Sequence, residues 1–232
     1  MKVLILGPAR SGTTTMTTLL GQHPSVEGQN YEPFHPSRYE QVGPEEQAKH
    51  LRQLFEEYDV VKCLHVQIPD DNLKAVLAVP THVILMARRN QLKRAVSACL
   101  ARTTKVWQPF GDKHVDYKTR SFPPLSLNAI GFELRKDARF LKRAELIRSV
   151  SEAKVIELVY EDFYLSGDPV SEALKLFESI GLDRPKKHRL DRLFGRTRLN
   201  DESTYARIEN IREIEERFGS DRTGHIVPHI KM

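Results

Sequence analysis

The segment at positions 7–14, Gly-Pro-Ala-Arg-Ser-Gly-Thr-Thr, combines glycines and hydroxyl side chains between an apolar run and a helix-like stretch. In this context successive backbone N–H groups and the N-terminus of the helix point at an anion, and the helix dipole favours negative charge. The pattern predicts a phosphate-binding loop rather than a plain glycine-rich turn. The residues assigned to the anion are Arg10, Ser11, Gly12, Thr13 and Thr14.

This loop lacks two features of metal-dependent nucleotide triphosphatases. Position 13 is Thr where that motif has Lys, and the basic group is Arg10 instead. The strand expected to end at Ala87 runs into Arg88-Arg89 rather than into an acidic magnesium ligand. The sequence therefore favours a reaction without a metal, in which cations and N–H donors hold the charge.

A second candidate anion site is formed by Arg89 and Ser97. We expect Arg89 at the end of a strand and Ser97 two helical turns into the next element. Arg can bind a phosphate through two charge-assisted hydrogen bonds, and Ser adds a hydroxyl donor. Taken alone, the pair would also fit an ordinary strand–helix junction with solvated basic residues.

Both segments resemble motifs of the PAPS-dependent sulfotransferases. The stretch at positions 8–14 is similar to the loop that binds the 5′-phosphosulfate of the donor, 3′-phosphoadenosine 5′-phosphosulfate (PAPS). Arg89 and Ser97 resemble the family's 3′-phosphate motif, with Gln91 in place of the common Pro. The segment running on to Trp107 is most similar to bacterial sulfotransferases of the trehalose 2-sulfotransferase type. The resemblance implies a P-loop fold and PAPS as donor.

The same resemblance suggests the groups that act on the acceptor. The segment at positions 28–35 is similar to the Glu-containing segment of carbohydrate sulfotransferases, which implies Glu32 as general base. His35 is the alternative base or a substrate contact; in a purely structural interpretation Glu32 is a surface carboxylate and His35 packs under Tyr39. Lys62 resembles the Lys that fixes the acceptor or the leaving group. His65 would lie on the opposite face of a regular strand and is interpreted as a core or edge histidine.

Three further segments have weaker signals. Residues 107–125, beginning at Trp107, are predicted to form an acceptor loop, since an aromatic platform suits sugars, although a Trp is as often part of the core. Residues 158–163 resemble a family segment and are interpreted as structural. Arg196 and Arg198 lie where the family clasps the 3′-phosphate, but they lack its glycine spacing.

The positions of apolar runs and turn residues predict the elements that hold these groups. Strands and helices alternate, which predicts a P-loop NTPase-like three-layer α/β/α fold with a central, mainly parallel sheet. The 232 residues fit a single domain, 1–232. Expected strands are 3–6, 60–66, 81–87 and 154–159; expected helices are 13–22, 45–58, 70–78, 92–105, 127–150, 171–180 and, near the C-terminus, 203–218.

Composition narrows the class of protein. Lys and Arg number 36 against 31 Asp and Glu, a net charge of +5, but the basic residues are interspersed with acidic ones, which argues against nucleic-acid binding. Cys63 and Cys99 show no metal or disulfide spacing, so we expect a reducing, cytoplasmic location. No apolar run approaches the roughly 18–20 residues of a membrane span.

The sequence thus predicts a PAPS-dependent sulfotransferase that sulfates an acceptor hydroxyl by in-line transfer without a metal. The acceptor is a small molecule or glycan, and the Glu-type base favours a carbohydrate or glycolipid. Two alternatives stay open: a P-loop nucleotide or small-molecule kinase, and a nucleotide-binding module without activity. Nothing in the sequence indicates the oligomeric state.

Overall fold

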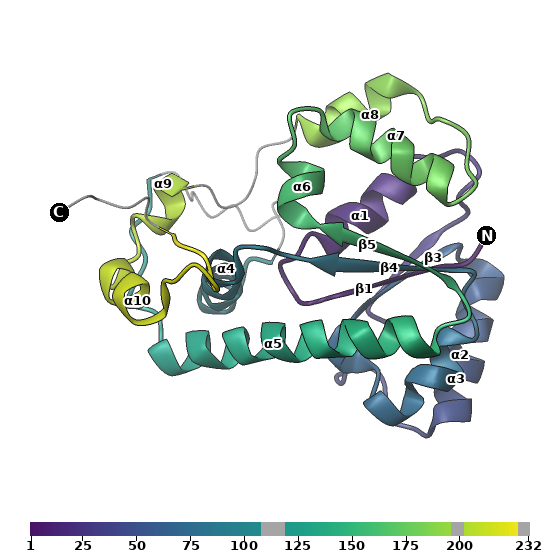
Figure 1. Ribbon diagram of the computed structural model, residues 1–232, viewed down its shortest axis with the longest axis horizontal. Helices are drawn as coiled ribbons and strands as arrows, with labels where there is room; N and C mark the ends of the chain where they lie inside the picture. Colours follow the sequence, from purple (N-terminus) through teal and green to yellow (C-terminus); the bar gives the residue numbers. More distant parts are fainter. Residues whose placement is uncertain (108–118, 196–201, 227–232) are drawn as a thin grey trace. The chain divides into compact units, whose positions relative to one another are not determined.

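The computed structural model describes residues 1–107, 119–195 and 202–226 (Figure 1). The chain divides into two compact units, which we describe separately. The first comprises Met1–Ala87 and Arg139–Gly195, and the second comprises Arg88–Ala138 and Arg196–Met232. The single domain expected from the chain length stays a prediction.

The described residues of the first unit contain a five-stranded sheet in the order β2-β3-β1-β4-β5, and every pairing in it is parallel. The central strand β1 is buried throughout, as expected where helices cover both faces of a parallel sheet. The predicted fold class is therefore confirmed. The strands are β1 (Val3–Gly7), β2 (Gln29–Tyr31), β3 (Val60–Leu64), β4 (His82–Ala87) and β5 (Lys154–Val159).

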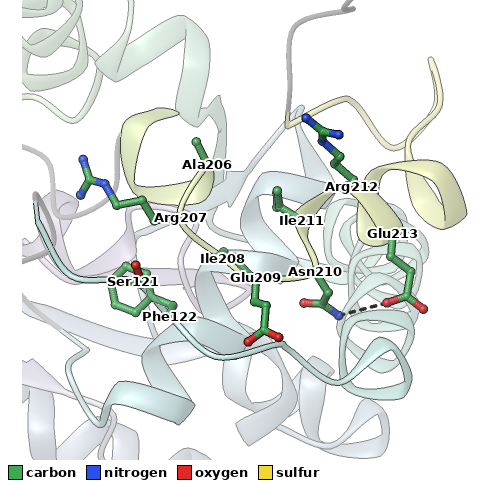
Figure 2. A pocket seen from close by; sticks show the side chains of 10 residues that line it. All are labelled: Ser121, Phe122, Ala206, Arg207, Ile208, Glu209, Asn210, Ile211, Arg212 and Glu213. Atoms are coloured by element: carbon green, nitrogen blue, oxygen red, sulfur yellow. Dashed lines mark hydrogen bonds between the residues drawn. The ribbon is translucent and has the colours of Figure 1, made fainter.

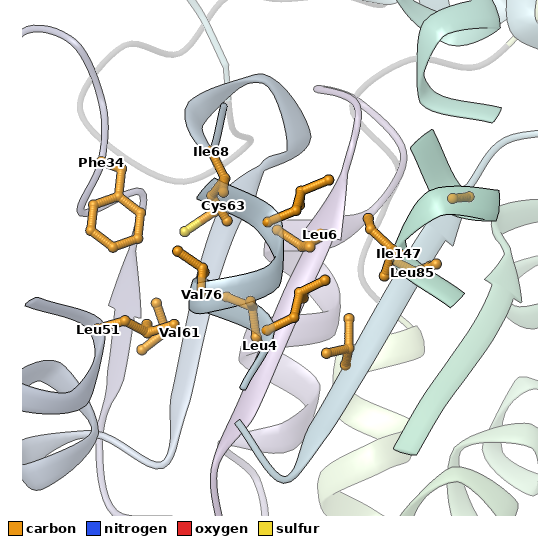
Figure 3. Packing of buried hydrophobic residues seen from close by; sticks show 14 of the residues in the cluster. Leu4, Leu6, Phe34, Leu51, Val61, Cys63, Ile68, Val76, Leu85 and Ile147 are labelled. Atoms are coloured by element: carbon orange, nitrogen blue, oxygen red, sulfur yellow. The ribbon is translucent and has the colours of Figure 1, made fainter. Parts of the chain in front are cut away.

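Alternate residues of β1 pack on opposite faces of this sheet and separate two hydrophobic clusters. Leu4 and Leu6 join one cluster (Figure 3), and Val3 and Ile5 join the other. The first face is covered by α2 (Pro44–Glu57), α3 (Leu73–Leu77) and residues 139–150 of α5 (Leu127–Val150). The second face is covered by α1 (Thr13–Leu20), α6 (Tyr160–Tyr164), α7 (Pro169–Ser179) and α8 (Lys187–Phe194).

The second unit is built from helices around its own apolar cluster. Its described helices are α4 (Gln91–Thr104), residues 127–138 of α5, α9 (Glu202–Tyr205) and α10 (Ile211–Phe218). Arg94 of α4 is fully buried, and its guanidinium bonds Glu133 at 3.0 Å and Asp137 at 2.6 Å. Burial raises the pKa of Asp137 to about 6, although the charge of Arg94 acts in the opposite direction.

The helix predicted over 203–218 is wrong, because two short helices, α9 and α10, occupy this stretch. Between them the backbone pairs with Phe122, whose N–H donates to Arg207 O at 3.0 Å and whose carbonyl accepts from Glu209 N at 3.1 Å. The Asn210 side chain bonds both the N–H and the carbonyl of Leu125, at 2.9 and 3.0 Å. These tertiary hydrogen bonds replace the intrahelical bonds that a continuous helix would need.

The remaining differences from the sequence prediction are smaller. The strand predicted over 60–66 ends at Leu64, and a 3₁₀ turn, His65–Gln67, follows it. A second 3₁₀ turn, Asp70–Asn72, precedes α3. The elements β2, α6 and α8 were not predicted. The limits of α5 and β5 agree with the prediction, and Gly181 follows α7 with a positive φ of 79°, as expected of a glycine after a helix C-terminus.

None of the helices within the described ranges combines the length and apolar character that crossing a bilayer requires.

Candidate functional site

The loop between β1 and α1 adopts the compact form expected of an anion cradle. Arg10 and Gly12 both have positive φ, 70° and 89°, so the chain turns sharply before α1 begins at Thr13. The first N–H groups of a helix have no acceptor within the helix, and they lie beside this turn. The backbone thus has the geometry on which the predicted phosphate contacts depend.

Both glycines of the loop are required by their surroundings. A Cβ at Gly7 would lie 2.6 Å from the backbone oxygen of Met86. A Cβ at Gly12 would lie 2.7 Å from the ring of Tyr164 and 2.9 Å from that of Tyr160. The loop is therefore packed against β4 on one side and against α6 on the other.

Tyr164 was not predicted as a residue of the site. Its hydroxyl donates to the carbonyl of Gly12 at 3.1 Å, and its ring stands 5.2 Å from that of Tyr160. Burial, with a smaller contribution from Tyr160, raises the pKa of Tyr164 well above its ordinary value, so the phenol keeps the proton that it donates. Residues 160–163 of the segment interpreted as structural thus lie in α6, the helix that packs against the loop.

The hydroxyl groups of the loop have different environments. Ser11 is fully buried, and its hydroxyl donates to the carbonyl of Pro8 at 2.7 Å, so this proton closes the turn. Thr13 is also buried, whereas Thr14 in the first turn of α1 and Arg10 are half-buried. The roles of these side chains in binding an anion stay predictions.

Glu32 and Lys62 are brought together by the pairing of β2 with β3. Glu32 directly follows β2 with a positive φ of 56°, and its N–H donates to Lys62 O at 2.7 Å. Its carboxylate forms an ion pair with the Lys62 ammonium. The Lys62 side chain is only 3% exposed and that of Glu32 is 28% exposed, so the carboxylate is the accessible member of the pair.

A third residue, Gln67, completes this group and was missed in the sequence. Its amide nitrogen donates to the second oxygen of the Glu32 carboxylate at 3.0 Å. The signal that could have found it is a polar residue shortly after a buried strand, since such residues line the carboxyl edge of a parallel sheet.

The side chains of His35 and His65 have different surroundings, and the His35 backbone N–H donates to Glu32 O at 3.1 Å. His35 is exposed and its Nδ1 lies 2.7 Å from Ser37 Oγ. The alternative in which His35 packs under Tyr39 is wrong, because Phe34 makes that contact, with ring centroids 4.8 Å apart. His65 is buried edge-on against Phe140 at 5.0 Å, as expected of a core histidine.

The loop and the Glu32–Lys62 pair share one edge of the sheet. The strand order places β3 between β2 and β1, and Lys62 is in register with Ile5 of β1 and Tyr31 of β2. Parallel strands end at the same edge, so the loop after β1 and Glu32 after β2 leave the sheet on the same side. This edge is where open α/β sheets bind ligands.

The second candidate anion site belongs to the second unit. Arg89 is exposed, whereas Ser97 lies within α4 and is only 2% exposed. Between them Asn90 caps α4 by accepting from Lys93 N at 2.8 Å and donates to His225 O at 2.7 Å. The joint action of Arg89 and Ser97 on a phosphate stays a prediction.

The predicted acceptor loop is described only at its ends. Trp107 is 44% exposed, residues 108–118 lie outside the described ranges, and so do Arg196 and Arg198. An open groove of about 730 Å³ in the second unit is lined by residues 121–122 and 206–213 (Figure 2). Arg207 and Arg212 stand at opposite ends of it, among Glu209 and Glu213, so its charge is mixed.

Across the described part of the chain, no cluster of three or more His, Cys, Asp and Glu side chains has the arrangement of a metal site.

Comparison with known proteins finds similarity in structure and none in sequence. No protein-family model and no curated protein sequence matches the chain. A similar solved structure is mouse sulfotransferase SULT7A1 in complex with PAP, with 13% sequence identity and a TM-score of 0.47. The alignment covers 86% of this chain and 66% of that one, just under two thirds of its length. A similarity of this size assigns no family.

Proposed function

We propose that this protein is a sulfotransferase that moves the sulfuryl group of PAPS to an acceptor hydroxyl. The acceptor oxygen attacks sulfur in line with the leaving phosphate oxygen, while Glu32 takes the hydroxyl proton. Sulfur gains one S–O bond and loses another, and adenosine 3′,5′-bisphosphate leaves. Arg10 and the N–H groups of the loop hold the developing charge, as preorganised donors do in other transfer reactions.

The observation that carries this proposal is the Glu32–Lys62 pair, one strand away from an anion loop that lacks the nucleotide-triphosphatase lysine. Each oxygen of the Glu32 carboxylate accepts one hydrogen bond, from Lys62 or from Gln67. A carboxylate oxygen has two acceptor sites, so capacity remains for the proton of a substrate hydroxyl. A partly exposed carboxylate that keeps free acceptor sites supports the proposed role of Glu32 as general base.

Other residues of the proposed site come from the sequence resemblance. Arg89 and Ser97 are assigned to the 3′-phosphate of PAPS, the group that distinguishes this donor from ATP. His35 and Trp107 are assigned to the acceptor, for which a carbohydrate or glycolipid hydroxyl is favoured. The reaction is proposed to proceed without a metal, because Thr13 replaces the lysine and Arg88-Arg89 replaces the acidic ligand of magnesium-dependent enzymes.

The donor is tested by radiolabel transfer to a panel of sugars, glycolipids and phenols. The proposal predicts transfer of ³⁵S from PAPS in the presence of EDTA. Transfer of ³²P from ATP with Mg²⁺, and none from PAPS, would identify a kinase instead. Tight binding of adenosine 3′,5′-bisphosphate without transfer to any acceptor would identify a nucleotide-binding module.

The base is tested with Glu32→Gln, which keeps the size of the side chain. We expect kcat to fall about 10²- to 10⁴-fold, the contribution typical of a general base, with unchanged affinity for adenosine 3′,5′-bisphosphate. Glu40→Gln, at an exposed carboxylate eight positions further along the chain, is the matched control. Turnover at the wild-type rate in Glu32→Gln, combined with its loss in His35→Asn, would transfer the role to His35.

A further inference from the structure

The side chain of Gln67 connects the candidate base to the end of β3. Its Oε1 accepts a hydrogen bond from Leu64 N at 2.8 Å, and its Nε2 donates to Glu32 Oε2 at 3.0 Å. Since the backbone group of Leu64 is a donor, the amide oxygen must face it. The amide nitrogen is therefore directed at Glu32, as a carboxylate acceptor requires.

The backbone of Gln67 is held by a chain of buried amides. Gln47 of α2 donates from its Nε2 to Gln67 O at 3.1 Å, and its Oε1 accepts from Asn72 Nδ2 at 2.8 Å. The same Asn72 nitrogen also donates to Val42 O at 3.0 Å. All three side chains are at most 8% exposed. A buried hydrogen-bonded network of this kind resists movement, because each broken bond would leave an unpaired polar group.

Arg143 holds the peptides on both sides of Gln67. Its guanidinium donates to His65 O at 2.5 Å and to Ile68 O, and it lies 3.2 Å from the carboxylate of Asp70. Gln67 is thus fixed by its own side chain, by Gln47 and, through its neighbours, by Arg143. Residue 67 lies in a 3₁₀ turn, so these side chains supply the rigidity that a long helix or strand would otherwise give.

We propose that Gln67 is a positioning residue, which together with Lys62 fixes the plane of the Glu32 carboxylate. This inference rests on the proposed role of Glu32 as base. One donor alone leaves a carboxylate free to rotate about its last bond, whereas a donor on each oxygen sets its orientation. The oxygen pair then presents its remaining acceptor sites toward the substrate in one direction.

Two substitutions separate positioning from mere support of the fold. Gln67→Met keeps the length of the side chain but removes both hydrogen bonds, and we expect kcat to fall about 10- to 100-fold, the range typical of residues that orient a reacting group from behind. The acceptor KM and the affinity for adenosine 3′,5′-bisphosphate stay unchanged. Gln67→Glu keeps the acceptor for Leu64 N but sets a second carboxylate against Glu32. Since like charges favour protonation, the acid limb of the kcat profile moves up by about one pH unit.

Gln53→Met, at an exposed glutamine of α2, is the matched control and keeps the wild-type kcat and pH profile. An unchanged kcat in Gln67→Met, or an unmoved acid limb in Gln67→Glu, overturns the proposal. A fall in kcat that is matched by an equal loss in bisphosphate affinity overturns it as well, because that pattern indicates general damage to the fold.

A second measurement does not depend on activity and keeps this inference separate from the proposed function. Unfolding temperatures of Glu32→Ala, Gln67→Met and the double variant form a double-mutant cycle. We expect the two losses to be non-additive, with a smaller loss from Gln67→Met once Glu32 is absent. Additive losses would refute the contact. Non-additive losses in a protein that transfers nothing from PAPS would refute the proposed function and leave Gln67 bound to Glu32.

Discussion

Substitution of Gly12 by Ala tests whether α6 fixes the form of the anion loop. Gly12 combines two requirements: its φ of 89° lies in the left-handed region, and a Cβ there would stand 2.7 Å from the ring of Tyr164. Gly181 has a similar φ of 79° but no atom within 4 Å of the corresponding Cβ. Gly167 has neither feature. The three Gly→Ala variants therefore separate backbone strain from steric conflict.

The expected loss of stability is the sum of backbone strain and steric conflict. The left-handed conformation costs an alanine about 1–2 kcal/mol, which is the whole expected effect at Gly181. Displacement of well-packed rings adds about 1–3 kcal/mol at Gly12. The total at Gly12 is therefore about 2–5 kcal/mol. With roughly 2–4 °C lost per kcal/mol in a protein of this size, Gly12→Ala lowers Tm by about 4–20 °C and Gly181→Ala by about 2–8 °C.

Differential scanning calorimetry measures the stability of the three variants. Titration with adenosine 3′,5′-bisphosphate measures their affinity for this ligand and so reports on the loop. Only Gly12→Ala is expected to weaken binding, because the loop backbone moves away from α6. Gly167→Ala keeps both the wild-type Tm and the wild-type affinity. Equal Tm and equal affinity for Gly12→Ala and Gly181→Ala would refute the reasoning, since the rings would then place no limit on the loop.

Three further predictions concern single groups. Tyr164→Phe removes the donor to Gly12 and lowers the unfolding free energy by about 0.5–1.5 kcal/mol; an unchanged value in urea denaturation contradicts this. Asn210→Ala leaves Leu125 N–H and C=O unpaired and costs about 1–3 kcal/mol by the same assay, whereas an effect within error would mean that the turn is held otherwise. Because the pKa of Asp137 is raised to about 6 in the folded state, this residue stabilises the fold at low pH, and its contribution to the unfolding free energy falls as pH rises from about 4 to 6. We expect this decline to be absent in Asp137→Asn. Identical profiles of unfolding free energy against pH for the two proteins would contradict the prediction.

Local sequence patterns were sufficient for most of the fold. The continuous apolar runs at β1 and β4 predict strands buried on both faces, and the glycines at 7 and 12 predict the turn between β1 and α1. The exact limits of α5 were also predicted. These features depend on neighbours within a few residues, which is the range over which a sequence pattern is informative.

The elements that were missed lack such patterns. Strand β2 has only three residues, Gln29–Tyr31, none of them buried, and it becomes a strand by pairing with β3. The break between α9 and α10 likewise could not be predicted from the charged stretch around it, because the break is caused by pairing with Phe122, which is distant in the sequence. Helix propensity favours a continuous helix there, and pairing with Phe122 overrides it.

The candidate site shows the same division. The candidate anion loop, with Arg10 and Thr13, was predicted from consecutive residues, and Glu32 and Lys62 from their resemblance to family segments. Their ion pair, however, results from the register of two strands. Gln67 had no motif to mark it. Its side-chain amide is oriented by Leu64 N, and its backbone carbonyl is held by Gln47 of α2.

The sequence by itself determined which chemistry is proposed, because the kinds of residue in one loop decide which anion it would suit and whether the lysine of metal-dependent enzymes is present. The tertiary structure alone decided which side chains meet. Asn210 and Leu125 are 85 positions apart, and Gln67 and Glu32 are 35 apart. A contact over such a distance depends on how sheets and helices pack, and packing balances many weak interactions that no short segment contains.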